Sequence, residues 1–78
     1  MRKLNALPHN SNILAKRIRQ LRLDAGLGQD ELAKQIGVTT GAISHYETGR
    51  TSPTITNLVS LARAFDTTLD DLMCERMR

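Results

Sequence analysis

The sequence is poor in the residues that hold small folds together through covalent or metal bonds. Among its 78 residues it has one cysteine, Cys74, and two separated histidines, His9 and His45. A single cysteine excludes an internal disulfide, and two isolated histidines do not provide the ligand cluster of a structural zinc site. We therefore expect a fold that relies on an apolar core. The single cysteine also fits a reducing compartment, where Cys74 would be a partly buried apolar residue.

Long apolar runs and catalytic motifs are also missing. No run approaches the roughly 20 residues of a membrane-spanning helix, and the start of the chain, MRKLNALPHNSN, lacks the apolar stretch of a signal peptide. There is no glycine-rich phosphate loop and no Ser-His-acid set, and the adjacent Asp70 and Asp71 would point in different directions on a helix. We expect one small cytoplasmic domain that is not an enzyme and needs no metal or cofactor.

Basic residues are concentrated in the first part of the chain. Eleven Lys and Arg residues against eight Asp and Glu residues give a net charge of +3 and a pI near 9.6. Residues 1–50 carry a net charge of +4, whereas residues 51–78 carry −1. This asymmetry points to a polyanionic partner such as nucleic acid, although +3 is also an ordinary solubilising charge.

The spacing of apolar residues predicts five short helices and no strand, an all-α domain over residues 12–74. Residues 1–11 are expected to form a flexible N-terminal arm and residues 75–78 a short tail. The expected helix stops are Gly26, Gly37 and Gly49, and the expected N-terminal caps are Thr39, Thr54 and Thr68. The expected inward-facing residues are Leu14, Ile18, Leu21, Ala25, Leu32, Ile36, Val38, Ile43, Tyr46, Ile55, Leu58, Leu61, Ala62, Phe65, Leu69 and Leu72.

The stretch QDELAKQIGVTTGAISHYET, residues 29–48, contains two of these helices joined only by GVT. So short a connection makes the helices cross steeply, with Gly37 in a left-handed turn and Ala33 at the close contact. Ile43 then points back under the first helix of the pair and seals a small core. This plan is a helix-turn-helix, whose second helix projects from the domain.

The stretch and the residues that follow it resemble the phage repressor and Cro-like helix-turn-helix family, also called the XRE family. The resemblance covers about residues 13–73 and implies a compact five-helix lambda-repressor-like fold. It also implies a sequence-specific transcriptional regulator that binds double-stranded DNA, and it favours a repressor. The alternative is an antitoxin or antirepressor-type module that binds another protein, with or without DNA. The residues that carry the resemblance are Gln29, Leu32, Ala33, Gly37, Ile43, Glu47, Gly49, Pro53, Leu58, Leu61, Ala62 and the stretch TTLDDLM.

The outer face of the helix at residues 39–48 is small and polar, and a B-DNA major groove about 12 Å wide admits such a helix. Gly41 departs from the commoner family pattern of a long polar side chain, so a larger share of specificity should come from DNA shape. For His45 the alternative is an ordinary solvated histidine. By the resemblance, the base-reading positions are Thr40, Gly41, Ser44 and His45, and the phosphate contacts are Gln29, Thr39, Thr48 and Arg50.

Arg22 and Glu47 are placed to meet inside the domain. Arg22 lies at the edge of the apolar stripe of the first helix, and Glu47 lies on the inward side of the helix at residues 39–48. The resemblance implies that they form a pair that holds these helices together. The alternative is that both are solvated charges, which contribute about 0–1 kcal/mol.

A homodimer is expected because a single helix of this kind contacts only a few base pairs, and the operator should then be an inverted repeat. Leu69, Met73 and Met77 recur every four residues and form the expected pairing surface. The alternative is that they only cap the core of a monomer. Arg2 and Lys3 give the N-terminal arm a basic start, which either follows the DNA backbone or is passive.

Overall fold

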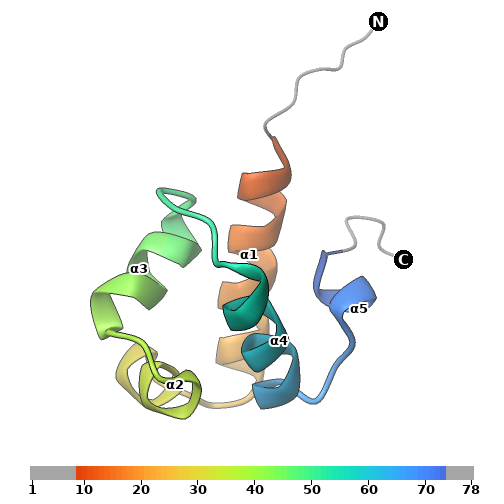
Figure 1. The fold of residues 1–78 in the computed structure, drawn as a ribbon. Helices are drawn as coiled ribbons and strands as arrows, with labels where there is room; N and C mark the ends of the chain where they lie inside the picture. The colour runs from red at the N-terminus through yellow and green to blue at the C-terminus, as the bar shows by residue number, and fades with distance from the viewer. Residues whose placement is uncertain (1–8, 74–78) are drawn as a thin grey trace, which may run out of the picture.

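The computed structural model describes residues 9–73, which form five helices and no strand (Figure 1). The all-α prediction is therefore confirmed over this range, and so are the five predicted helical segments. The helices are α1 (His9–Asp24), α2 (Gln29–Ile36), α3 (Thr40–Thr48), α4 (Ile55–Ala64) and α5 (Leu69–Met73).

Several sequence predictions lie outside the described residues. They concern Arg2 and Lys3 in the N-terminal arm, Cys74, Met77 and the tail at residues 75–78. Helix α1 begins at His9, so the predicted start of the domain at residue 12 falls inside this helix. Polar residues are common in a first helical turn, where free N–H groups need acceptors, so a polar stretch such as HNSN is compatible with the start of a helix.

Local signals end and begin the helices where the sequence predicted. Gly37 and Gly49 end α2 and α3 with left-handed backbones, at φ values of 77° and 78°. Thr39, Thr54 and Thr68 each accept a hydrogen bond through Oγ1 from the backbone N–H three residues later, at 3.0, 3.2 and 3.0 Å. These bonds satisfy N–H groups that would otherwise lack partners at the start of α3, α4 and α5.

Each of the five helices places a fully buried side chain in one shared core. Helix α1 packs against α3 and α5, α2 packs against α3 and α4, and α4 packs against α5. In Figure 1, α3 lies at the left of α1 and α5 at the right. Pairwise packing around one core thus places α3 at the edge of the domain. Among the side chains that the structure describes, five have no exposed surface: Ile18, Leu32, Ile43, Leu61 and Leu72.

Two of the predicted core residues are exposed. Ile55 is 70% exposed because it is the first residue of α4, before the helix reaches the core. Ala25 is exposed because α1 ends at Asp24 and Ala25 enters the turn at Gly26, where φ is 73°. Within residues 9–73 no helix has the length and apolar character needed to cross a membrane.

Two glycine substitutions should change stability in opposite directions. Gly37→Ala should lower the free energy of unfolding by about 1 kcal/mol, because alanine is strained at positive φ. Gly41→Ala should raise it by about 0.5 kcal/mol, since an added Cβ inside α3 meets only Thr39 Oγ1 within 4 Å, at 3.9 Å. Urea unfolding of both variants measures this, and a loss of equal size at the two positions would contradict it.

Candidate nucleic-acid interface

The turn between α2 and α3 has the geometry that the sequence predicted. The N–H groups of Gly37 and Val38 both donate to the carbonyl of Ala33, at 2.9 and 3.0 Å. Ala33 is buried, and its small side chain allows the two helices to approach closely. The left-handed Gly37 then redirects the chain, so that α3 leaves α2 after residues 37–39.

The outward face of α3 carries the four residues predicted to read bases. Thr40, Gly41 and His45 are exposed, and Ser44 is half-buried. The one acidic residue in α3, Glu47, faces inward and its side chain is only 3% exposed. This face therefore offers hydrogen-bonding groups of both kinds without an exposed carboxylate that would repel DNA phosphates.

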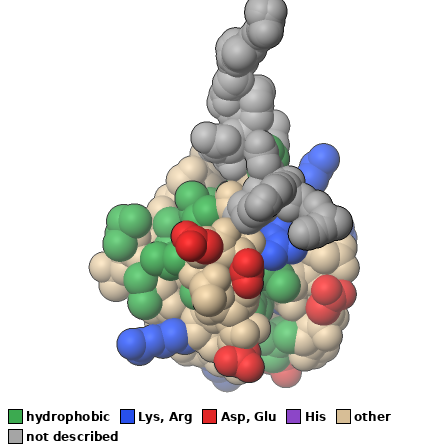
Figure 2. All heavy atoms as spheres, turned by 90° about the vertical axis from the view of Figure 1, so that its right-hand side faces the viewer, with side chains coloured by type: hydrophobic (Ala, Val, Ile, Leu, Met, Phe, Trp, Pro, Cys, Tyr) green, Lys and Arg blue, Asp and Glu red, His purple; other side chains and the backbone are tan. Residues whose placement is uncertain are grey.

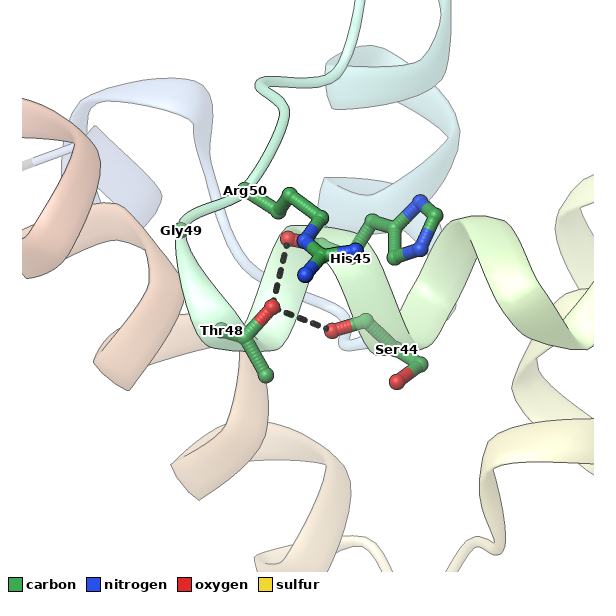
Figure 3. A pocket seen from close by; sticks show the side chains of 5 residues that line it. All are labelled: Ser44, His45, Thr48, Gly49 and Arg50. Carbon is green, nitrogen blue, oxygen red and sulfur yellow. Dashed lines mark hydrogen bonds between the residues drawn. The ribbon is translucent and has the colours of Figure 1, made fainter.

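The C-terminal part of this face forms a shallow hollow (Figure 3). It is lined by Ser44, His45, Thr48, Gly49 and Arg50. The left-handed Gly49 lets the N–H of Arg50 donate to the carbonyl of His45 at 2.9 Å, which fixes the start of the following loop. The Arg50 cation thus lies beside the outward face of α3, where it can attract a phosphate.

Thr48 is less suited to a phosphate contact than the sequence suggested. Its hydroxyl donates to the carbonyl oxygens of Ser44 and His45, at 3.1 and 3.3 Å. A phosphate oxygen needs a donor, and the single hydroxyl hydrogen of Thr48 is already engaged within α3. Thr39 differs, because its Oγ1 accepts from the N–H of Ala42 and keeps its own hydrogen available.

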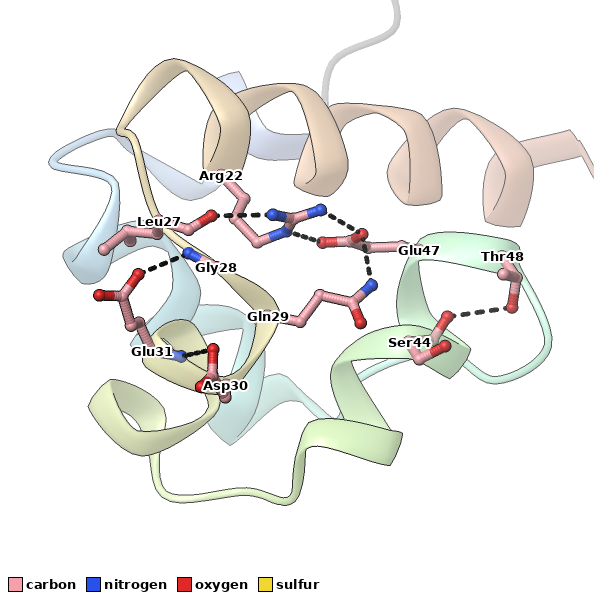
Figure 4. A network of polar contacts seen from close by, with 9 residues as sticks. All are labelled: Arg22, Leu27, Gly28, Gln29, Asp30, Glu31, Ser44, Glu47 and Thr48. Atoms are coloured by element: carbon pink, nitrogen blue, oxygen red, sulfur yellow. Dashed lines mark hydrogen bonds and ion pairs between the residues drawn. The ribbon is translucent and has the colours of Figure 1, made fainter.

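A buried ion pair joins α3 to α1 (Figure 4). Arg22 Nε and Nη2 donate to Glu47 Oε2 and Oε1, at 2.6 and 3.0 Å. Arg22 Nη1 also donates to the carbonyl of Leu27 at 2.8 Å, in the turn before α2. The hydrogen bonds that Arg22 donates to the Glu47 carboxylate raise the pKa of Arg22, which favours its charged form further. The two side chains are 9% and 3% exposed, which supports the predicted pair and rules out two solvated charges.

Gln29 joins the same network at the start of α2. Its Nε2 donates to Glu47 Oε1 at 3.1 Å, so one amide hydrogen is engaged and the second is left for a phosphate. The positive end of α2 is already offset by its own acids. Glu31 accepts from the N–H of Gly28, and Asp30 accepts from the N–H of Glu31. A phosphate contact here would depend on the Gln29 amide and little on the helix dipole.

Sequence reasoning missed a second polar link to α3, the hydrogen bond from Asn57 to Tyr46. A signal for it existed, because Tyr46 was predicted to be buried and a buried tyrosine hydroxyl usually has a polar partner. The sequence alone did not show which residue would supply that partner. The Leu27 carbonyl that accepts from Arg22 was missed as well, since backbone acceptors carry no sequence signal.

The family model for the helix-turn-helix matches residues 18–72. The chain therefore belongs to the helix-turn-helix family, and within it to the phage repressor and Cro-like (XRE) type that its sequence resembles.

Its relatives differ in length. Repressor protein C2 of Salmonella phage P22 is 34% identical over 64 residues, which are 82% of this chain and 30% of that protein. The transcriptional activator BcrR of Enterococcus faecalis is 34% identical over 58 residues, 74% of this chain and 28% of that protein. An HTH-type transcriptional regulator of Archaeoglobus fulgidus is 38% identical over 56 residues, 72% of this chain and 80% of that protein. The chain thus spans less than a third of the first two relatives and most of the third.

A solved structure of the P22 c2 repressor, in complex with a synthetic operator, matches this fold with a TM-score of 0.77. The identity is 33%, over 81% of this chain and 96% of that chain. The predicted lambda-repressor-like fold is therefore confirmed.

Removing the charge of Glu47 should destabilise the fold strongly. Glu47→Gln should lower the free energy of unfolding by about 3 kcal/mol, because a buried guanidinium would lose its carboxylate. The double variant Arg22→Met/Glu47→Leu should be less destabilised than Glu47→Gln, since no buried charge remains. Urea unfolding measures both.

An exposed pair on α1 provides the control for this experiment. Gln20 Nε2 donates to Asp24 Oδ1 at 2.9 Å on the surface, so Asp24→Asn should change the free energy of unfolding by less than about 0.5 kcal/mol. A cost for Glu47→Gln no larger than that of Asp24→Asn would contradict the structural role of the pair.

Proposed function

We propose that the protein is a sequence-specific DNA-binding transcriptional regulator that places α3 in the major groove of its operator. The observation that carries this proposal is the outward face of α3, which is polar, free of exposed carboxylates and bordered by Arg50. Thr40, Ser44 and His45 would contact base edges, while Gly41 would let the backbone approach a thymine methyl group. The operator bound to the related P22 c2 repressor supports the proposal.

The opposite side of the domain is unsuited to DNA. Asp66, Asp70 and Asp71 are exposed in and before α5, and Figure 2 shows acidic side chains spread among apolar and a few basic ones on this face. Phosphates would be repelled there and attracted near Arg50, so the domain would approach DNA in one orientation. A DNA ligand would also place the protein in the cytoplasm.

We further propose that the regulator is a repressor, as the phage relative is named, although BcrR is named an activator. Repression requires only that the bound protein covers a promoter. Activation requires an additional contact with the transcription machinery, and repression is therefore the simpler use of a small DNA-binding domain.

A titration of labelled duplexes tests the proposed function. An operator selected from random DNA should bind at least about 10³-fold more tightly than a scrambled duplex, and its affinity should fall as salt is added. Equal affinity for every sequence, or an affinity that salt does not change, would contradict the proposal.

Two variants separate base reading from phosphate binding in the same titration. His45→Ala should weaken operator binding by about 1–3 kcal/mol and relax the base preference at the one base pair that His45 contacts. Arg50→Ala should weaken binding to every duplex and reduce the slope of affinity against salt by about 0.9. Arg63→Ala removes the same charge from an exposed position on α4 and serves as the control. An unchanged binding-site profile for His45→Ala would remove His45 from the base-reading set.

We also propose that the protein binds its operator as a homodimer. One module of this size covers only roughly 600–1,000 Å², and a two-fold dimer would place its α3 helices about 34 Å apart, one turn of DNA. Of the predicted pairing residues, Leu69 packs against the core and offers little surface to a partner. Met73 is 50% exposed and remains accessible. Ile55 and Val59, one turn apart on α4, provide further exposed apolar surface.

Sedimentation with and without operator tests the dimer. Two chains should bind each inverted repeat, and Ile55→Ser/Val59→Ser should weaken binding to the full repeat more than to a half-site. One chain per operator, or a preferred site without two-fold symmetry, would exclude the homodimer and favour a different protein as the partner of this surface.

A further inference from the structure

A hydrogen bond between Tyr46 and Asn57 joins α3 to α4. The Tyr46 ring is buried in the core, with 7% of the residue exposed, and Asn57 is half-buried in the first turn of α4. Asn57 Nδ2 donates to Tyr46 Oη at 3.0 Å. The backbone N–H of Asn57 donates to Thr54 Oγ1, so the turn that carries the amide is itself fixed.

This bond lies beside the buried ion pair, because Tyr46 directly precedes Glu47 in α3. Glu47 connects α3 to α1 and α2 through Arg22 and Gln29, whereas Tyr46 connects it to α4. Consecutive side chains on a helix point about 100° apart, so the two connections pull in different directions. Together they oppose rotation of α3 about its own axis, which either connection alone would leave less restricted.

Apolar packing of α3 against α1 and α2 involves few fully buried side chains. The buried residues of α3 are Ile43 and Tyr46, whereas α4 buries three side chains. The outward face of α3 is exposed at Thr40, Gly41 and His45, so only the inward face holds the helix. The polar connections at Tyr46 and Glu47 act on this inward face and add to the apolar packing against α1 and α2.

We propose that Asn57 is a positioning residue for operator recognition: through Tyr46 it fixes the rotation of α3 and so the direction in which Ser44 and His45 meet the bases. This inference rests on the proposed function. Base-edge hydrogen bonds weaken steeply as distance and angle depart from ideal values, whereas attraction between a cation and a phosphate tolerates such changes. Loss of the Asn57 amide should therefore weaken specific binding and leave non-specific binding unchanged.

The test compares operator with scrambled DNA for Asn57→Leu, a variant of similar size that leaves Tyr46 Oη without its donor. Both dissociation constants are measured at a temperature where unfolding curves show the protein to be folded. Operator affinity should fall about tenfold, the order expected from one lost hydrogen bond, with scrambled-DNA affinity and the salt slope unchanged. A role in stability alone would move none of these three quantities.

Two matched variants on α4 complete the experiment. Asn57→Asp can keep the connection in the reverse direction, with the Tyr46 hydroxyl donating to the carboxylate, and an acid suits the first turn of a helix. Its charge should weaken binding to both duplexes and leave the ratio of the two affinities as in the wild type. Ser60→Ala removes a hydrogen bond that lies within α4, from Ser60 Oγ to the carbonyl of Thr56 at 3.2 Å, and should leave the ratio unchanged.

The outcomes separate this inference from the proposed function. A wild-type protein that binds operator and scrambled DNA equally would overturn the function itself. If the wild type discriminates and Asn57→Leu discriminates equally well, the positioning role is wrong and the function stands. A parallel fall of both affinities for Asn57→Leu would also overturn the positioning role.

Tyr46 is the one tyrosine in a chain without tryptophan, so near-ultraviolet absorption checks its hydrogen bond directly. An unchanged tyrosine absorption spectrum in Asn57→Leu would contradict the hydrogen bond between Asn57 and Tyr46.

Discussion

The arrangement of the first three helices depends on the carboxylate of Glu47, a charge held inside the domain. A carboxylate that is 3% exposed has lost most of its hydration and needs compensation from the protein. Arg22 and Gln29 supply it, and Arg22 also binds the Leu27 carbonyl, so one charge determines how α1, the following turn, α2 and α3 meet. Buried pairs of this kind contribute little net stability compared with apolar residues, but any arrangement that separates them is costly. The pair therefore selects one arrangement of the helices more than it stabilises the folded state.

Sequence reasoning succeeded where the determining residues are close together in the chain. The left-handed glycines and the capping threonines depend on partners three or four residues away, and all of them could be identified. The interior was predicted from helical periodicity, which failed at Ile55 and Ala25 because periodicity does not show where a helix first reaches the core. The outward positions on α3 followed from the same periodicity and are confirmed as surface at Thr40, Gly41 and His45.

The polar contacts between helices were harder to predict, since they depend on how separate helices pack. The partners Arg22 and Glu47 are 25 residues apart, and helical geometry showed only that they could meet, while the family resemblance implied the pair. The amide of Gln29 was expected to face DNA, yet one of its hydrogens is directed at Glu47. The hydroxyl of Thr48 is likewise engaged within its own helix. Assigning such side chains to a ligand from sequence overlooks the bonds that they already make inside the protein.

Gly41 allows the outward face of α3 to change without a change in the fold. It lies in the first turn of α3, on the exposed face, with no protein atom nearer to an added Cβ than Thr39 Oγ1 at 3.9 Å. Its backbone is helical, so most other side chains can be placed there without disturbing the core. If α3 reads DNA as proposed, one codon change at this position after a gene duplication would give one copy a different target sequence while the other copy kept the original. The interior residues would be under the same selection in both copies, and the two regulators could diverge in their targets while folding alike.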